Sequence, residues 1–430
     1  MIGTHKVTKK NILLACITLF SINIKQLLKI EIMKKVILLG LICITLCCQC
    51  SNYNVIRVEN EAQFVASEEY NEKKLSLLRN HIGTADDFDV SGYIESECVF
   101  DIDMSNVSGV SELSDFKIGP DGDIFIATHD AIYRFSKDGH FKTKLSGVGR
   151  GYDECVTLEN MAINDKNNTI LVLDGLNKVL IFDYNTNKVL NSIELDWKGK
   201  ALRSDAIIPD KRDGGFYIFS AKLITSEIDI NPYCIHKFDK RGKKIAEGLL
   251  CEDFVLDFSP VSQGCENKYY INPVGSENCI WEIDNGRINI AKYIDFEGRN
   301  LKNKLPYKDN LNMINFYNML LSDSYKCVTN VKDTRDHISF TYAGNNAEPY
   351  LCIASKKSDD KIILSTPNKT SFTKKIIYSD EEYFYFFHNK KTMDGIESSA
   401  CPITKYLISK YGLIEGGASP KIVGLKFKID

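Results

Sequence analysis

Proline and tryptophan are scarce in this chain of 430 residues, which has ten Pro and two Trp. A proline-rich or low-complexity protein is therefore excluded. The sequence also lacks a His-Glu-x-x-His pair, a Gly-x-Ser-x-Gly nucleophile elbow and a phosphate-binding loop, and none of the nine cysteines after Cys50 has Cys-x-x-Cys spacing. The most recognisable signatures of zinc proteases, α/β-hydrolases and nucleotide-binding enzymes are thus absent.

Positive charge is also in short supply once the N-terminus is set aside. The formal net charge is −3, but residues 1–47 hold seven Lys and one Glu, so the remainder has 47 basic against 56 acidic residues, a net charge of −9. A domain of that sign is repelled by a phosphate backbone, and no basic stripe interleaved with aromatic residues is present. We therefore expect no nucleic-acid partner.

Long apolar runs are confined to the N-terminus. Two of them, residues 11–24 and 36–45, each follow a pair of lysines. A short positive start before about 7–15 apolar residues is typical of a secretory signal, and neither run reaches the roughly 20 residues of a membrane-spanning helix. We interpret residues 33–47 as a signal peptide and residues 1–32 as an upstream extension from a mis-assigned start. One long signal region is the alternative.

A cysteine cluster, Leu46-Cys47-Cys48-Gln49-Cys50, closes the second apolar run and resembles the lipobox of bacterial lipoproteins, where a lipidated cysteine becomes the first mature residue. Cys48 is the preferred candidate because the small Cys47 precedes it. Cys50 follows Gln49 and Cys47 follows the bulky Leu46, so these two are the alternatives. The resemblance implies an anchor in the lipid bilayer, at either face of the outer membrane, with a cleaved soluble signal as the alternative reading.

The segment that follows is polar. Residues 48–94 lack a clear strand period and include the charged run from Ser67 to Lys74. This composition predicts a tether with some helix between the membrane and a folded domain. We place the folded domain at residues 95–430.

The domain contains a repeat of about 46 residues, with clear copies at 116–141, 161–190, 207–243 and 267–286. In each copy a short apolar strand leads through an Asp, Asn or Gly turn to a second strand rich in β-branched and aromatic residues. A third and a fourth strand follow. Gly, Asn and Asp suit such turns because they tolerate positive φ. Four antiparallel strands per 40–50 residues are typical of a propeller blade.

The second strands give a count, because their anchors recur at spacings of 46, 46, 53, 69 and 45 residues. The anchors are Ile124, Ile170, Phe216, Tyr269, Ile338 and Tyr383. Six units predict an all-β fold, a six-bladed β-propeller with four-stranded antiparallel blades. A helix inserted near 305–325 explains the longest spacing, and a second short helix, capped by Gly412, is predicted near 400–412. Lone strands at 98–104 and 421–429 are expected to complete one blade together.

Three stretches carry a family resemblance: residues 121–126, 135–141 and 147–154. On them the region 95–430 resembles the six-bladed β-propeller lipoproteins of Gram-negative gut anaerobes, relatives of the NHL-repeat propellers. The resemblance implies a propeller fold and a cell-envelope compartment, without a settled activity. The family usually has Gly-x-Gly-Pro-Gly-Glu-Tyr in the third stretch, where this sequence has Arg150 in place of Pro. This departure puts in doubt any function carried by that loop.

The same loop provides the candidate ligand-binding residues, Arg150 and Tyr152. Its glycine run, Gly147-x-Gly149-x-Gly151, follows a strand but opens no helix, so it indicates a tight crossing between blades rather than a nucleotide site. The alternative for Arg150 and Tyr152 is that they only pack this crossing.

The remaining polar and thiol groups show no ligand spacing. Asp121, Asp123, Asp138 and Asp165 are interpreted as turn formers, with a calcium site as the alternative. The histidines are scattered, so no metal and no cofactor are predicted. The cysteines beyond Cys50 are odd in number and are expected to be small buried residues, with one or two disulfides as the alternative.

Two functions remain open. The first is a binding or scaffold module, because a propeller holds a rigid funnel of loops at one end of its central channel, where a glycan, peptide or partner protein could bind. The second is a metal-dependent propeller hydrolase or lyase of the lactonase type, which needs several carboxylates and amides converging on a central cation. The absence of a visible catalytic constellation favours the first.

Overall fold

The structure is a computed structural model, and its described residues are 54–59, 61–77, 81–82, 88–107, 113–149, 151–175, 178–197, 204–220, 233–250, 261–272, 278–298, 326–344, 348–365, 376–388, 401–412 and 420–429. Contacts divide the chain into residues 1–54 and 55–430, and only Asn54 of the first unit is described. The predicted signal peptide and the helix predicted near 305–325 therefore lie outside the described residues. No described helix is both long and apolar enough to cross a membrane.

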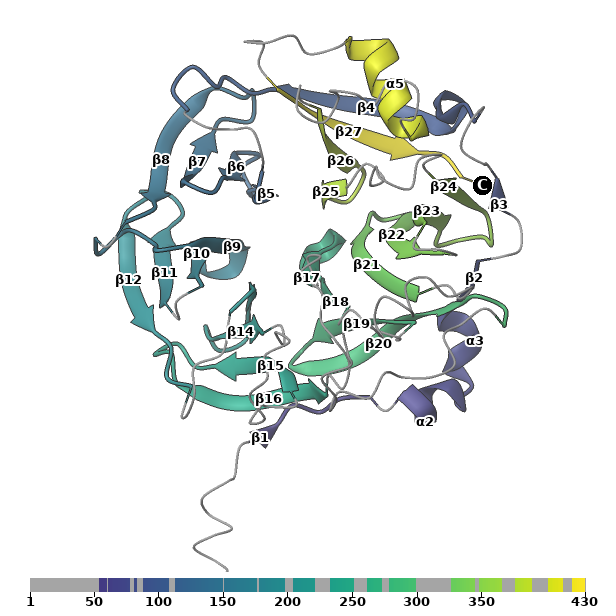
Figure 1. Ribbon diagram of the computed structural model, residues 1–430. Coiled ribbons are helices and arrows are strands. Elements are labelled where there is room, and N and C mark those ends of the chain that lie inside the picture. The colour runs from purple at the N-terminus through teal and green to yellow at the C-terminus, as the bar shows by residue number, and fades with distance from the viewer. Residues whose placement is uncertain are drawn as a thin grey trace, which may run out of the picture. The chain divides into compact units, whose positions relative to one another are not determined.

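In the second unit, the described strands form six sheets around a centre, with the first strand of each innermost (Figure 1). Blade 1 consists of β5 (Asp115–Ile118), β6 (Ile124–Ala127), β7 (Ala131–Phe135) and β8 (Phe141–Gly147). Blade 2 consists of β9 (Leu158–Asn164), β10 (Thr169–Asp174), β11 (Lys178–Asp183) and β12 (Val189–Glu194), with η2 (Asp165–Asn167) in its first turn. Blade 3 consists of β13 (Ala206–Pro209), β14 (Phe216–Phe219), β15 (Tyr233–Phe238) and β16 (Lys244–Leu250).

The other three blades repeat this order. Blade 4 consists of β17 (Val261–Gln263), β18 (Tyr269–Ile271), β19 (Cys279–Asp284) and β20 (Arg287–Asp295), with η3 (Cys265–Asn267) in its first turn. Blade 5 consists of β21 (Lys326–Asp333), β22 (His337–Ala343), β23 (Pro349–Ser355) and β24 (Lys361–Ser365). Blade 6 consists of β25 (Ile376–Ser379), β26 (Phe384–His388), β27 (Lys421–Phe427) and β4 (Ile94–Asp101). The predicted six-bladed all-β propeller with four-stranded antiparallel blades is confirmed.

The hydrophobic core of the described part lies between neighbouring blades. One cluster joins Phe125 of β6 to Met161 of β9 and Val172 of β10, and comparable clusters fill the other boundaries. All four residues of β6 are buried, because its sheet is packed on both faces. A strand covered on both faces is apolar throughout instead of alternating. The dense second strands that revealed the repeat in the sequence follow from this packing.

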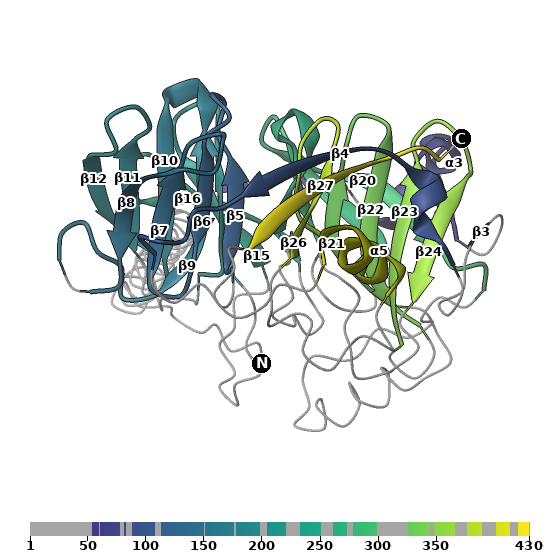
Figure 2. The ribbon, with the colours of Figure 1, turned by 90° about the horizontal axis from the view of Figure 1, so that it is seen from above.

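The ring closes by pairing strands from far apart in the chain. β27 lies antiparallel to β4, with a register that runs from Lys421 opposite Asp101 to Phe427 opposite Ile94 (Figure 2). The two lone strands predicted to complete one blade therefore do so. The short helix near 400–412 is also confirmed as α5 (Pro402–Tyr411), where Gly412 donates its backbone N–H to the carbonyl of Ile408 at 2.9 Å.

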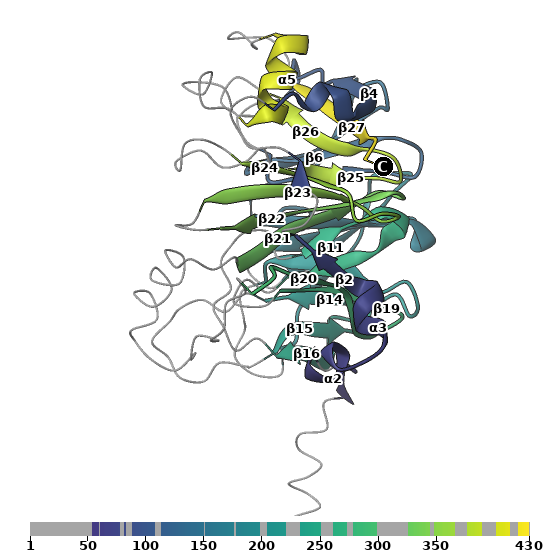
Figure 3. The same cartoon turned by 90° about the vertical axis from the view of Figure 1, so that its right-hand side faces the viewer.

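The region predicted to be a tether, residues 48–94, differs from that expectation in its described part. It contains β1 (Asn54–Val55), α2 (Glu61–Val65), α3 (Glu69–Lys73), β2 (Lys74–Ser76), β3 (His81–Ile82) and η1 (Val90–Tyr93). β2 adds a parallel strand to β20, and β3 adds one to β24, along the outer edges of blades 4 and 5 (Figure 3). Phe64 and Leu77 are buried against the sheets. The sequence does not reveal this docking, because the apolar residues of the segment are widely spaced among charged ones. The segment pairs with the outer strands of blades 4 and 5, whose edges would otherwise be unpaired.

Buried carboxylates link neighbouring blades at the end where first and second strands join. Asp123 accepts hydrogen bonds from Arg134 Nε and Lys142 Nζ, both at 2.6 Å, and Arg134 Nη1 donates to Asn187 Oδ1 of blade 2 at 2.7 Å. The Arg134 and Asp123 side chains are only 6% and 4% exposed. The sequence predicts a turn former at Asp123, and the structure adds that this carboxylate holds Arg134, which hydrogen-bonds to blade 2.

Replacing Arg134 with Met should lower the free energy of unfolding by about 3–5 kcal/mol, because the buried Asp123 carboxylate loses one of its two cationic partners and blade 1 loses the hydrogen bond to Asn187 of blade 2. The measurement is a urea denaturation curve of the purified protein. Arg335→Met is the control, since the Arg335–Glu381 pair is exposed on both sides and such pairs contribute little. Equal midpoints for the two variants would contradict a special role for the buried link.

Candidate binding site in the central cavity

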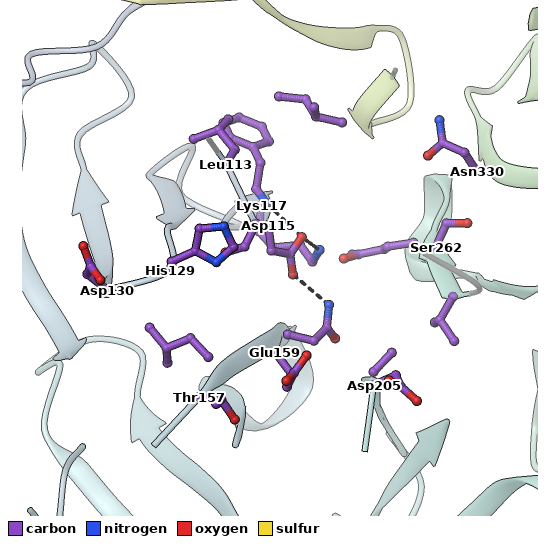
Figure 4. Close-up of a pocket in the computed structure, with 18 of the residues that line it drawn as sticks. Leu113, Asp115, Lys117, His129, Asp130, Thr157, Glu159, Asp205, Ser262 and Asn330 are labelled. Atoms are coloured by element: carbon purple, nitrogen blue, oxygen red, sulfur yellow. Dashed lines mark hydrogen bonds and ion pairs between the residues drawn. The ribbon is translucent and has the colours of Figure 1, made fainter. Parts of the chain in front are cut away.

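A cavity of about 560 Å³ lies at the centre of the ring, among the first strands of all six blades. We call it the central cavity. Most of the residues that line it are polar (Figure 4). The lining includes Ser114, Asp115, Lys117, His129, Asp130, Val148, Val156, Thr157, Glu159, Asn160, Asp205, Ser262, Asn330, Lys332 and Ile377.

The cavity opens toward one end of the blades. His129 and Asp130 belong to the turn between β6 and β7, and Val148, Val156 and Thr157 belong to the crossing between β8 and β9. Both connections lie opposite the turns that carry the Arg134 link, because alternate connections of an antiparallel sheet fall at alternate ends. The end that stabilises the blades is thus separate from the end that is open to a ligand.

A chain of hydrogen bonds crosses the cavity wall from blade 1 to blade 3. Asp115 accepts from Lys117 Nζ at 2.5 Å and from Asn160 Nδ2 of blade 2 at 2.9 Å (Figure 4). Asn160 Oδ1 in turn accepts from the backbone N–H of Ile207 in blade 3 at 3.1 Å. Asp115 and Asn160 therefore hold the inner strands in register, and Lys117 is neutralised by its partner.

The other charges around the central cavity are of both signs, with acids in excess. Asp130, Glu159 and Asp205 come from blades 1 to 3, and Lys332 comes from blade 5. Figure 4 shows Ser262 and Asn330 across the cavity from His129. A wall of this kind presents hydrogen-bond donors and acceptors in a fixed geometry, which suits recognition of a polar ligand.

The crossing loop that carried the sequence-predicted ligand residues is well held. Gly149 donates its N–H to the Cys155 carbonyl at 2.8 Å, and Gly151 donates to Glu154 Oε2, also at 2.8 Å. A Cβ on Gly149 would meet the Glu154 carboxylate, so any larger residue there requires the Glu154 side chain to move. The prediction of a tight blade-to-blade crossing is thus confirmed.

Of the two predicted ligand residues, Tyr152 is the described one, and it is not part of the central cavity wall. Tyr152 is 65% exposed on the crossing loop and does not line the cavity, whereas its neighbours Val148 and Val156 do. Arg150 lies outside the described residues. Their role in binding therefore stays a prediction.

The site residues that sequence reasoning missed lie on the first strands of blades 1, 2, 4 and 5. Asp115, Glu159, Asn160, Ser262 and Asn330 all sit in or beside a first strand, upstream of a second-strand anchor. The repeat located the anchors because their apolar density stands out. Polar residues in the preceding strand are the signal that could have found the cavity wall, since a first strand at the centre of a ring faces the axis.

Comparison with protein families matches residues 107–410 to a family described as "Domain of unknown function (DUF4934)". The chain belongs to this family. A comparison with curated proteins gives no match.

Three solved structures align with this DUF4934 member, and the first of them shares its fold. A protein of Bacteroides fragilis NCTC 9343 (BF0058), described as exported, aligns with a TM-score of 0.61 at 14% identity, covering 83% of this chain and 99% of that one. A protein of unknown function from Bacteroides thetaiotaomicron VPI-5482 aligns with a TM-score of 0.30 at 11% identity, covering 55% of each chain. The WD40 propeller domain of Doa1 aligns with a TM-score of 0.31 at 10% identity, covering 63% of this chain and 70% of that one.

Nucleophilic chemistry is not assembled among the described residues. Ser262 lies across the central cavity from His129 (Figure 4). Seven of the described cysteines are free thiols, and six of these seven are buried, as predicted from the sequence. Burial, followed by the charge of Asp174, raises the pKa of Cys155 to about 11, and burial followed by Asp333 raises the pKa of Cys265 to about 12. Both thiols are protonated at neutral pH and so are poor nucleophiles.

The described residues also contain no group of three or more His, Cys, Asp or Glu side chains placed to hold a metal ion. The carboxylates around the central cavity are spread over three blades, and Asp115 is already engaged by Lys117 and Asn160. What the described wall offers is a set of separate hydrogen-bonding groups.

Replacing Asp115 with Asn should destabilise the fold by about 1.5–3 kcal/mol, because Lys117 then lacks its charged partner in a half-buried site. Asp130→Asn is the matched control, since Asp130 also lines the cavity but is exposed. Thermal unfolding of both variants measures the difference. An unchanged midpoint for Asp115→Asn would mean that its carboxylate is available to a ligand instead of serving the wall.

Proposed function

We propose that this protein is an exported, lipid-anchored binding module whose central cavity holds part of a glycan, a peptide or a partner protein. The observation that carries the proposal is a cavity of about 560 Å³ with a polar wall built by all six first strands. Volumes of about 300–1,000 Å³ with a few fixed polar groups are typical of ligand sites. Because the wall belongs to a closed ring, its geometry is set before the ligand arrives, which limits the entropic cost of binding.

Export and anchoring are supported by the sequence and by a relative. The apolar run of residues 36–45 and the lipobox-like cysteines favour lipidation at Cys48, with Cys50 and Cys47 as alternatives. The B. fragilis protein of the same fold is described as exported. The pattern of strands and turns in the repeat favours an NHL-like propeller. At the outer membrane, two or three acyl chains on the lipidated cysteine would hold the domain firmly.

Binding is favoured over the metal-dependent hydrolase alternative. A lactonase-type site needs several carboxylates and amides converging on one cation. Here Asp115 and Asn160 bond to each other across blades 1 and 2, and Glu159 and Asp205 come from separate blades. Groups arranged in this way support recognition by hydrogen bonding more readily than Lewis-acid chemistry.

Anchoring is tested by growing a Gram-negative host with an alkyne-tagged palmitate and detecting the tag on the purified chain. Wild type, Cys47→Ser and Cys50→Ser should carry the label, whereas Cys48→Ser should lose it, because the acyl chains are attached to the lipidated cysteine. Label that is lost only in Cys50→Ser would move the anchor to that residue. No label on wild type would refute lipidation.

Binding in the central cavity is tested by screening the full chain, purified in detergent, on glycan and peptide arrays, then measuring affinity for the best hit. Ser114→Trp should weaken that affinity at least tenfold, because the exposed Ser114 lines the cavity and an indole there fills its mouth. Ser409→Trp, on the exposed face of α5, is the matched control. Equal affinities in the two variants would place binding elsewhere.

A further inference from the structure

One side chain of the central cavity wall has an unusual backbone. Asn330 lies in β21, the first strand of blade 5, where the pairing with β22 shifts register both before Thr329 and between Thr329 and Lys332. Its φ is 50°, in the left-handed region that side chains other than Gly and Asn rarely adopt. The chain therefore bulges at Asn330, and a bulge redirects a side chain out of the regular strand pattern.

The amide of Asn330 is buried without using its hydrogen-bonding capacity. The residue is only 4% exposed, it lines the central cavity, and neither Nδ2 nor Oδ1 has a hydrogen-bond partner within the described part of the chain. Buried polar groups in proteins are nearly always paired, because leaving them unpaired is destabilising. In Figure 4 the amide points from blade 5 toward the middle of the cavity.

A second asparagine of the same wall shows the contrast. Asn160 also lines the central cavity, but its Nδ2 donates to Asp115 and its Oδ1 accepts from the backbone of Ile207. Asn160 is thus a structural amide, with both atoms used by the fold. In Asn330, by contrast, neither Nδ2 nor Oδ1 bonds to the described part of the chain, so both atoms are available to a ligand.

The chemistry of the Asn330 amide limits which ligand groups can pair with it. A side-chain amide presents a donor and an acceptor side by side. Nδ2 can therefore donate to the carbonyl of an amide in a ligand, while Oδ1 accepts from a neighbouring N–H or O–H of the same ligand. A carboxylate or phosphate would use only Nδ2 and would face Oδ1 with like charge. Once Asp115 and Lys117 neutralise each other, three carboxylates and one lysine remain around the cavity, which further disfavours an anion. The hydroxyl of Ser262 lies on the same side and can serve as either partner.

We propose that Asn330 is a ligand-recognition residue and that the central cavity binds a ligand with a secondary amide, whose carbonyl accepts from Nδ2 of Asn330 while an adjacent N–H or O–H of the ligand donates to Oδ1. This inference rests on the proposed binding function and deepens it. The amide can come from the N-acetyl group of a sugar or from a peptide backbone, and the experiment separates these sources.

The experiment measures binding of N,N′-diacetylchitobiose and of trialanine to the detergent-purified full chain by isothermal titration calorimetry. Cellobiose is the control probe, because it has the same sugar backbone as the chitobiose without acetamido groups. One amide probe should bind and cellobiose should not. Binding of the chitobiose identifies an N-acetylated glycan, and binding of trialanine identifies a peptide.

The variants are Asn330→Gly and Asn330→Asp, with Asn285→Gly as the matched control. Glycine adopts a φ of 50° without strain and removes the amide, whereas Asp keeps the size of Asn and loses its donor. Both Asn330 variants should lower the affinity for the amide probe at least tenfold, which is the effect expected for losing one or two buried hydrogen bonds. Asn285 has a φ of 45° in the β19–β20 turn, away from the cavity, so its replacement should leave binding unchanged.

A stability readout distinguishes recognition from a structural role. Without ligand, Asn330→Gly should unfold at the same temperature as wild type or higher, because it removes an unpaired buried amide and a strained φ. A fall of several degrees would assign Asn330 to the fold and overturn the proposal. Equal affinity of wild type and Asn330→Gly for an amide probe, or equal binding of cellobiose and chitobiose, would also overturn it.

Failure of this inference can be told apart from failure of the proposed function. If an array hit loses affinity in Ser114→Trp but neither amide probe binds, the central cavity still binds a ligand and only the amide assignment falls. If the arrays give no hit and neither amide probe binds, both the proposed binding function and this inference are refuted.

Discussion

The pairing of β4 with β27 is the constraint on which the rest of the domain depends. β4 precedes blade 1 in the chain, and β27 is the last strand, so their register joins residues more than 300 positions apart. Without it, blade 6 lacks its fourth strand, and the hydrophobic clusters on the two sides of that blade lose Ile94 and Phe100 of β4. Closure converts an open series of sheets, each with exposed faces, into a ring in which every described sheet is covered.

Closure also creates the candidate site, because a cavity lined by six first strands exists only when the ring is complete. The two ends of the blades then serve different purposes. At one end, Arg134 is paired with Asp123 of its own blade and donates to Asn187 of blade 2. Asp333 of blade 5 joins blades 4 and 5, because it accepts from Tyr270 of blade 4 at 2.9 Å and from Lys356 at 2.5 Å. At the other end, polar groups face the central cavity, and one of them, Asn330, is left without a partner by the fold.

Much of the fold could be predicted from the sequence because its information is local and repeated. All six second-strand anchors lie in or directly before a second strand, from Ile124 at the start of β6 to Tyr383 just before β26. The docking of residues 61–77 could not be predicted, since Phe64 and Leu77 are isolated apolar residues and their partners are outer strands distant in the chain. Candidate site residues were drawn from a glycine-rich loop, and the structure leaves Tyr152 exposed beside the central cavity instead of in its wall.

The sequence by itself determined the blade architecture, the ring-closing strands, the terminal helix α5 and the burial of the cysteines, because apolar density, turn residues and spacing report directly on strands covered on both faces. Only the tertiary structure decided which polar residues meet. Asp115, Asn160 and Ile207 are bonded across three blades, and Asn160 and Asn330 differ in nothing that the sequence displays. Whether a buried amide is used by the fold or kept for a ligand depends on the backbone of neighbouring blades, and that is fixed only when the ring has closed.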